Sequence, residues 1–134
     1  MKLIVCLDDA GGMMFNHRRQ SRDRVLITDM IRHAGNTPLW VSPYSAPLFG
    51  EDAPTLQATL NPLELAKATD SCFLEDTPLP PTLDDVNELL IYRWNRLYPS
   101  DVRFTCDTSA FVLAENTEFV GSSHDKITKE IWKK

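Results

Sequence analysis

The densest run of polar residues lies between Asn16 and Arg24, shortly after a pair of glycines. Within this run, Arg18 and Arg19 could clamp a phosphate or a carboxylate, because guanidinium groups present paired N–H donors that match both anions. Asn16 adds a further polar side chain. Binding residues concentrate on loops that a rigid scaffold positions, which favours a ligand role over a solvated loop whose arginines pair with nearby acids. We therefore predict Asn16, Arg18 and Arg19 to be ligand-binding residues.

Two residues of the same run are candidates for catalysis. His17 could act as a general acid or base, since free imidazole has a pKa of about 6.5. No serine or cysteine nucleophile stands in a readable order beside it, so the alternative is an exposed loop histidine. Asp23 could bind a ligand, or it could be an ordinary acid at a helix start, which contributes roughly 0.3–1 kcal/mol through the helix dipole.

Aromatic and basic residues alternate in a second polar segment, which holds Tyr92, Arg93, Trp94 and Arg96. Such a surface could stack on a planar ring and neutralise a phosphate. The alternative is a strand whose aromatic side chains enter the core while the arginines extend to solvent. If Arg93 and Arg96 line the same pocket as the arginines of the first polar run, the ligand role is favoured.

The elements that must position these residues begin with an apolar strand at Leu3–Leu7. A continuous apolar run of this length is typical of a strand that is covered on both faces. Glycines then favour a turn, and Ser21 is the expected N-cap of a helix, with Asp23 in its first turn. The apolar spacing predicts that this helix ends near Gly35.

Strands dominate the second half of the chain, with proline-rich loops and short helices between them. We expect helices from Asn61 to about Ala68 and near Thr82–Asp85, one helical turn near Ser45–Phe49, and strands at Pro38–Val41, Cys72–Leu74, Leu89–Trp94, Val102–Thr105, Phe111–Glu115 and Ile127–Trp132. Strands and helices alternate in the first part of the chain, and strands cluster in the last part. This order predicts a single α/β domain over residues 1–134, with an antiparallel sheet edge.

Composition restricts the class of protein. Hydrophobic residues make up 43% and charged residues 25% of the chain, the profile of a soluble globular protein. The net charge of −5 argues against nonspecific nucleic-acid binding, and the longest apolar run is too short to span a membrane. The three widely spaced cysteines predict free thiols in a reducing cytoplasm.

Both ends of the sequence resemble dihydrofolate reductase. Leu3–Asp8 followed by two glycines resembles the first strand of that family, and Ser21–Val25 resembles the start of its pterin-binding helix. Val86–Trp94 resembles a later strand, and the segment from Phe111 to Lys134 resembles the final hairpin. The resemblance implies a shortened three-layer α/β sandwich, with a mixed central sheet and an antiparallel C-terminal edge hairpin.

The same resemblance assigns roles to two residues. Asp23 falls where the family places the carboxylate that hydrogen-bonds the pterin ring. Tyr92 stands where the family has a threonine bonded to that acid.

The middle of the chain departs from the family pattern. Ser42–Ser45 replaces the family's Gly-Arg-Lys-Thr/Ser, which contacts the cofactor phosphate, and Glu75-Asp76 replaces its Gly-Gly pair. An acidic pair would repel a pyrophosphate. These departures argue against NADPH-dependent reduction.

A zinc hydrolase of the ribonuclease Z type is excluded on chemical grounds. Such enzymes hold zinc through a His-x-His-x-Asp-His motif, whereas the three histidines here are isolated, at His17, His33 and His124. We predict no metal site.

The sequence therefore predicts a small cytoplasmic protein that binds an anionic planar molecule resembling a nucleotide or a pterin. It predicts no membrane association, does not favour nucleic acid as the partner, and leaves a homodimer open. One alternative is an enzyme, either a divergent reductase or a metal-independent hydrolase that uses His17 with Asp8 or Asp23. The other is a module in which the arginine–aromatic strand binds RNA or a protein.

Overall fold

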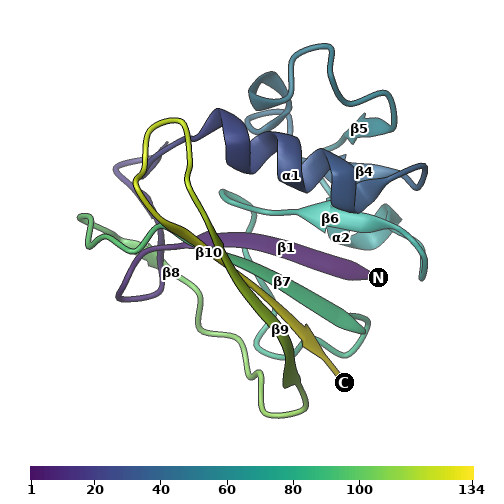
Figure 1. The fold of residues 1–134 in the computed structure, drawn as a ribbon. Helices are drawn as coiled ribbons and strands as arrows, with labels where there is room; N and C mark the ends of the chain where they lie inside the picture. Colours follow the sequence, from purple (N-terminus) through teal and green to yellow (C-terminus); the bar gives the residue numbers. More distant parts are fainter.

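A seven-stranded mixed sheet organises the chain, as seen in the computed structural model, which describes residues 1–134 (Figure 1). The strand order is β5-β4-β6-β1-β7-β10-β9. The first five strands are parallel to one another, β10 is antiparallel to β7, and β9 is antiparallel to β10. The bounds are β1 Lys2–Leu7, β4 Leu39–Val41, β5 Leu56–Ala58, β6 Ser71–Phe73, β7 Glu88–Arg93, β9 Val112–Phe119 and β10 Ile127–Lys133. The predicted α/β fold with an antiparallel C-terminal edge is confirmed.

The apolar strand β1 occupies the centre of the sheet, between β6 and β7. Its residues alternate between two hydrophobic cores: Leu3 and Val5 belong to one, and Ile4 belongs to the other. Helix α1 (Arg24–Ala34) covers the second core, whereas the first is covered by loops and the short helix α2 (Pro62–Leu65). Burial on both faces explains why β1 is apolar from Leu3 to Leu7.

The N-cap of helix α1 lies two residues after the predicted one. The N-cap is Asp23, whose Oδ1 accepts hydrogen bonds from the amides of Val25 and Leu26 at 3.0 and 3.2 Å. Ser21 was the wrong choice, because its hydroxyl lies against a histidine from another part of the chain. Asp23 therefore stands before the first turn rather than within it, and the helix ends at Gly35, where φ is 58°.

A second, three-stranded sheet has the order β3-β2-β8 and lies beside the carboxyl end of β1. It is formed by Arg18–Arg19 (β3), Gly12–Phe15 (β2) and Val102–Arg103 (β8). Part of the expected polar loop is thus a strand, and β8 is shorter than predicted.

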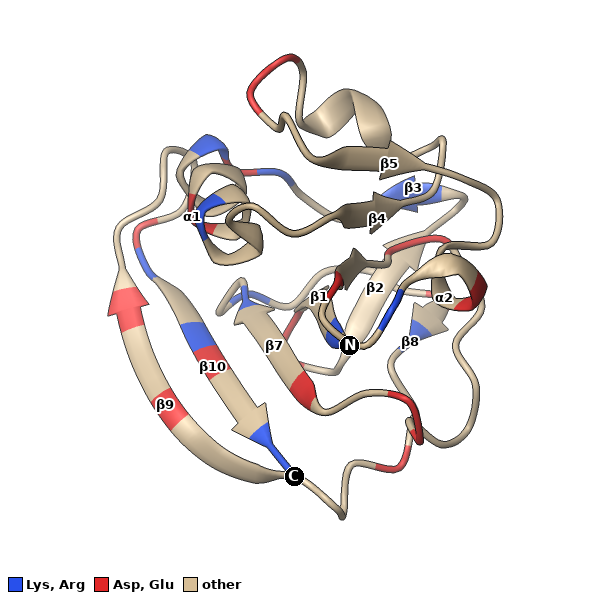
Figure 2. Ribbon diagram, turned by 90° about the vertical axis from the view of Figure 1, so that its right-hand side faces the viewer, with Lys and Arg blue, Asp and Glu red and all other residues tan.

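Other boundaries also differ from the predictions. Helix α2 ends at Leu65 rather than near Ala68, no helix forms at Thr82–Asp85, and β5 was not predicted. The helical turn at Ala46–Leu48 (η1) is confirmed. No helix has the length and hydrophobicity needed to cross a membrane. The charged residues of β9 are acidic, whereas β10 carries both acidic and basic residues (Figure 2).

A buried hydrogen bond fastens α1 to the sheet. Tyr92 on β7 is fully buried, and its hydroxyl donates to Oδ2 of Asp29 at 2.6 Å. Lys129 on β10 contacts the same carboxylate, with its Nζ 3.1 Å from Oδ2. The contact raises the pKa of Tyr92 far above its usual range, because burial and the neighbouring carboxylate both oppose ionisation of the phenol.

We expect Tyr92→Phe to lower the free energy of unfolding by roughly 1.5–3 kcal/mol, the usual contribution of a hydrogen bond to a charged group. Chemical denaturation followed by circular dichroism measures the change. An unaltered denaturation midpoint would contradict the stabilising role of this bond.

Candidate functional site

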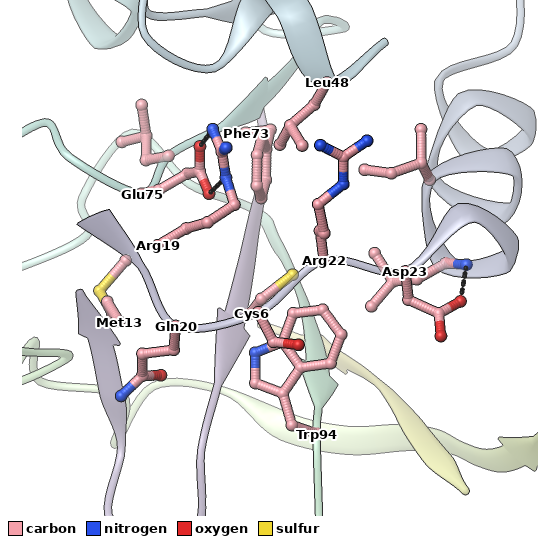
Figure 3. A pocket seen from close by; sticks show the side chains of 14 residues that line it. Cys6, Met13, Arg19, Gln20, Arg22, Asp23, Leu48, Phe73, Glu75 and Trp94 are labelled. Atoms are coloured by element: carbon pink, nitrogen blue, oxygen red, sulfur yellow. Dashed lines mark hydrogen bonds and ion pairs between the residues drawn. The ribbon is translucent and has the colours of Figure 1, made fainter. Parts of the chain in front are cut away.

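A cavity lies at the carboxyl ends of β6, β1 and β7, where open α/β sheets bind their ligands (Figure 3). Phe73, Cys6 and Trp94, from the ends of these three strands, form its apolar wall. The residues before and within the first turn of α1 close the other side. Burial raises the pKa of the Cys6 thiol well above its usual range, so this residue is a neutral part of the wall.

Arg19 lines the cavity, but its guanidinium is already paired. Its Nε and Nη2 each donate to Glu75 at 3.0 Å, and the group lies 4.6 Å from the centre of the Tyr44 ring. Glu75 also accepts a hydrogen bond of 2.6 Å from the Ser45 hydroxyl. Figure 3 shows this bidentate pair at one side of the cavity. The sequence suggested that Arg19 would bind an external anion, whereas here it neutralises a buried carboxylate of the chain.

The Asp23 carboxylate is fully occupied by the chain. Besides capping α1, it accepts the amides of Ser122 and Ser123 at 3.0 and 2.8 Å, from the turn that joins β9 to β10. His124 Nδ1 lies 3.3 Å from Oδ2, and the side chain of Asp23 has no exposed surface. In Figure 3 the carboxylate points away from Trp94.

These contacts decide the ionisation of Asp23. Burial alone would raise its pKa, but hydrogen bonds from the amides of Ser123, Ser122 and Leu26 and from the His124 ring outweigh burial. The pKa of Asp23 is therefore held well below its usual range, and the carboxylate is ionised at neutral pH.

Gly121 permits the close approach of the β9–β10 turn to this carboxylate. A Cβ atom at position 121 would collide with the Asp23 side chain, so a residue larger than glycine would displace the turn.

His124, which sequence reasoning did not select, lies buried between this carboxylate and the cavity wall. Its ring stacks on Trp94 with the ring centres 4.6 Å apart and the planes inclined by 27°. Its Nε2 lies 3.1 Å from the Ser21 hydroxyl and 3.0 Å from the Tyr98 hydroxyl. His124 is 101 residues from Asp23 in sequence, and no local pattern could have indicated their contact.

Two polar groups at the cavity have no partner within the chain. Arg22 is exposed, and its guanidinium forms no ion pair or hydrogen bond, although its backbone carbonyl accepts from the Ser123 hydroxyl at 2.7 Å. Gln20 donates its amide hydrogens to Asp8 and to the Pro99 carbonyl, at 3.0 and 3.2 Å, but its Oε1 is buried without a donor. Buried polar atoms are rarely left unpaired, so a water molecule or a ligand would satisfy this oxygen.

The cavity is narrow, and a wider groove adjoins it. Its open interior of about 20 Å³ is roughly the space of one water molecule. The groove, of about 330 Å³, runs beside α1 and η1. Four residues line both spaces: Arg22, Asp23, Ile27 and Leu48.

The remaining predicted site residues lie elsewhere. Asn16, His17 and Arg18 are exposed around the β2–β3 turn, and none of them lines the cavity. Tyr92 lies in the core under α1, Arg93 pairs with Glu130 at 3.0 Å, and Arg96 is exposed. Of the predicted residues, the structure brings together Arg19, Asp23 and Trp94, and the four arginines do not converge.

Comparisons with known proteins identify the fold. No protein-family model matches the sequence, and no curated protein sequence matches it. Among solved structures, the chain is similar to dihydrofolate reductase from Enterococcus faecalis complexed with NADP(H) and RAB-propyl, with a TM-score of 0.71. The chain has a dihydrofolate-reductase-like fold. The alignment covers 98% of this chain and 94% of that one, at 11% sequence identity, so what the two share is the fold.

The low pKa of Asp23 predicts a loss of stability in acid. A carboxyl group that binds its proton more weakly in the folded state stabilises the fold above its unfolded pKa of about 3.9, and this contribution is lost as the pH falls further. We expect Asp23→Asn to lower the free energy of unfolding by roughly 1–3 kcal/mol at pH 7, because an amide N–H₂ then faces the Ser123 amide. Asparagine caps helices as well as aspartate, so α1 is retained.

Urea denaturation of both proteins between pH 7 and pH 3 measures this difference. The difference in the free energy of unfolding between the two proteins should become smaller as the pH falls, since position 23 carries a titratable group only in the wild type. A gap that stays constant over this range would show that Asp23 has an ordinary pKa.

Proposed function

We propose that this protein binds a small planar anionic molecule, with its ring in the cavity beside Trp94 and its negative charge on Arg22. The observation that carries the proposal is an unpaired arginine next to an aromatic wall. The dihydrofolate-reductase-like fold supports it further, because the cavity stands at the carboxyl ends of the parallel strands.

The apolar wall suits a flat ring. Trp94 and Phe73 present aromatic carbon, and Trp94 is held in place by its stacking on His124. Offset stacking of aromatic rings contributes roughly 0.5–1.5 kcal/mol beyond the burial of area. The unpaired Oε1 of Gln20 would accept an N–H donor, which a nitrogen heterocycle such as a purine or a pterin supplies.

Arg22 supplies the charge selectivity. Arg19 is neutralised by Glu75, whereas the guanidinium of Arg22 remains free and lines both the cavity and the outer groove. A ligand whose ring enters the cavity would place a carboxylate or phosphate at this point. Ring entry needs the cavity to widen, and the exposed Arg22 side chain is the group best able to move.

The residues after β4 and β6 do not fit the phosphates of NADPH. Glu75 and Asp76 follow β6, and their carboxylates accept hydrogen bonds of 2.6 Å from Ser45 and Ser42, which follow β4. The hydroxyl groups of these serines are therefore directed to internal carboxylates. Glu75 is paired with Arg19, so Asp76 is the negative charge that would repel a pyrophosphate at this edge. We accordingly propose binding without NADPH-dependent reduction.

Replacement of Arg22 tests the proposed anion site. We expect Arg22→Gln to weaken binding of guanosine monophosphate or folate by roughly 10- to 100-fold, the value of one charge-assisted hydrogen bond. Titration followed by tryptophan fluorescence measures the affinity. Arg18→Gln is the matched control, because Arg18 is an exposed arginine of the same segment that does not line the cavity.

The uncharged analogues guanosine and pterin should bind wild type and Arg22→Gln equally. If neither anion binds the wild-type protein at millimolar concentration, or if Arg18→Gln weakens binding as much as Arg22→Gln, the anion site is not at Arg22.

A second titration tests the cofactor. We expect NADPH to give no saturable change in the fluorescence of the protein or the nicotinamide up to about 1 mM, because the Asp76 carboxylate opposes its phosphates and the hydroxyl groups of Ser42 and Ser45 are already directed to internal carboxylates. Saturable binding of NADPH at micromolar concentration would instead support the divergent reductase.

A further inference from the structure

We propose that Ser21 and His124 form a nucleophile–base pair for acyl transfer, with Asp23 as the positioning residue, and that its substrate is a carboxylic ester whose planar part enters the cavity. The pair goes beyond ligand binding, because it gives the cavity a reactive atom. Three side chains make up the constellation: one serine, one imidazole and one ionised carboxylate.

The three side chains stand in the order that nucleophilic catalysis requires. Ser21 Oγ lies 3.1 Å from His124 Nε2, and His124 Nδ1 lies 3.3 Å from Asp23 Oδ2. Both contacts are hydrogen bonds, the second a long one, as is common in catalytic sites before a substrate binds. Such a constellation is recognised by its geometry and not by sequence order.

The ionised carboxylate sets the tautomer of the imidazole. A carboxylate can only accept hydrogen bonds, and the Ser123 hydroxyl, 3.0 Å from the same ring nitrogen, donates its own proton to the Arg22 carbonyl at 2.7 Å. Both neighbours therefore favour a proton on Nδ1 of His124. In the neutral ring, Nε2 then carries the lone pair that can take the proton of Ser21. Stacking on Trp94 and burial of the ring keep this nitrogen aimed at the Ser21 hydroxyl.

Ser21 is placed to meet a substrate. It lines the cavity and is partly exposed, whereas His124 and Asp23 are buried behind it. The amide N–H groups of Ser21 and Arg22 donate to no acceptor in the chain, so they remain available to an oxyanion beside the nucleophile. Tyr98 also contacts Nε2 at 3.0 Å, and its hydroxyl must release this nitrogen when Ser21 donates to it.

The reaction balances with water as the only co-reactant. Ser21 Oγ attacks the ester carbonyl carbon while its proton passes to His124 Nε2. The bond from the carbonyl carbon to the alcohol oxygen then breaks, and His124 returns the proton to the leaving alcohol. Water attacks the acyl-serine, gives one proton to His124, and releases the carboxylic acid as Ser21 regains its hydrogen.

The organophosphorus fluoride diisopropyl fluorophosphate tests the nucleophile. Attack by Ser21 Oγ forms a P–O bond, breaks the P–F bond and releases fluoride and the serine proton. We expect intact-mass spectrometry of the wild-type protein to show one added phosphoryl group, and peptide mapping to place it on Ser21. Hydrolysis of p-nitrophenyl acetate should require the same residues as the labelling reaction.

Variants separate catalysis from folding. Ser21→Ala should lose the adduct while its melting curve shows an intact fold, and Ser109→Ala, in an exposed loop far from the cavity, should label like the wild type. Asp23→Asn should label roughly 10³- to 10⁴-fold more slowly, the loss typical of a wrong tautomer. The dependence of the labelling rate on pH should differ between the wild type and Asp23→Asn, a readout that a merely structural role of Asp23 would leave unchanged.

The absence of an adduct on Ser21 in the folded wild-type protein, or an adduct that persists in Ser21→Ala, would overturn the proposal. Such a result would leave ligand binding at Arg22 intact, because that binding is measured without any reaction.

Discussion

The structure around the cavity depends on one buried carboxylate. Asp23 is contacted by six polar groups of the chain, two from the first turn of α1 and four from the β9–β10 turn. A buried charge is tolerated only when it is paired and hydrogen-bonded in this way. The carboxylate thereby joins segments about a hundred residues apart, and it fixes the position of His124, which in turn supports Trp94.

A second buried carboxylate, Glu75, performs a similar task at the other side of the cavity. Arg19 and Ser45 both donate to its oxygens, so neither is available to bind a ligand. The chain thus uses two of its acids to hold the walls of the cavity. What remains available is chemically simple: the aromatic wall, the free Arg22, the unpaired oxygen of Gln20 and the hydroxyl of Ser21.

Patterns within single segments predicted much of the fold. The apolar run of β1, the helical spacing of α1 and the aromatic strand β7 are signals that depend on burial, and burial repeats along the chain. The dihydrofolate-reductase-like fold followed from the order of these elements and from the resemblance at both ends of the sequence. The helix start was misplaced because Ser21 and Asp23 are both good caps, and a contact with His124 decides between them.

The candidate site was less accessible to sequence reasoning. Arg18 and Arg19 are adjacent, yet alternation along β3 leaves one exposed and turns the other to Glu75. Nothing local distinguishes them, because the partner carboxylate is 56 residues away. His124 follows two serines in a turn without any motif, and only the closure of the β9–β10 hairpin over α1 brings it to Asp23.

The tautomer of His124 tests the account most directly, since it reports the bond to Asp23 and the free lone pair facing Ser21 at once. Long-range ¹H–¹⁵N correlation spectra of the wild-type protein should show the neutral His124 ring with its proton on Nδ1. A ring protonated on Nε2 alone would contradict the account, because Asp23 would then have no donor from His124 and Ser21 no base.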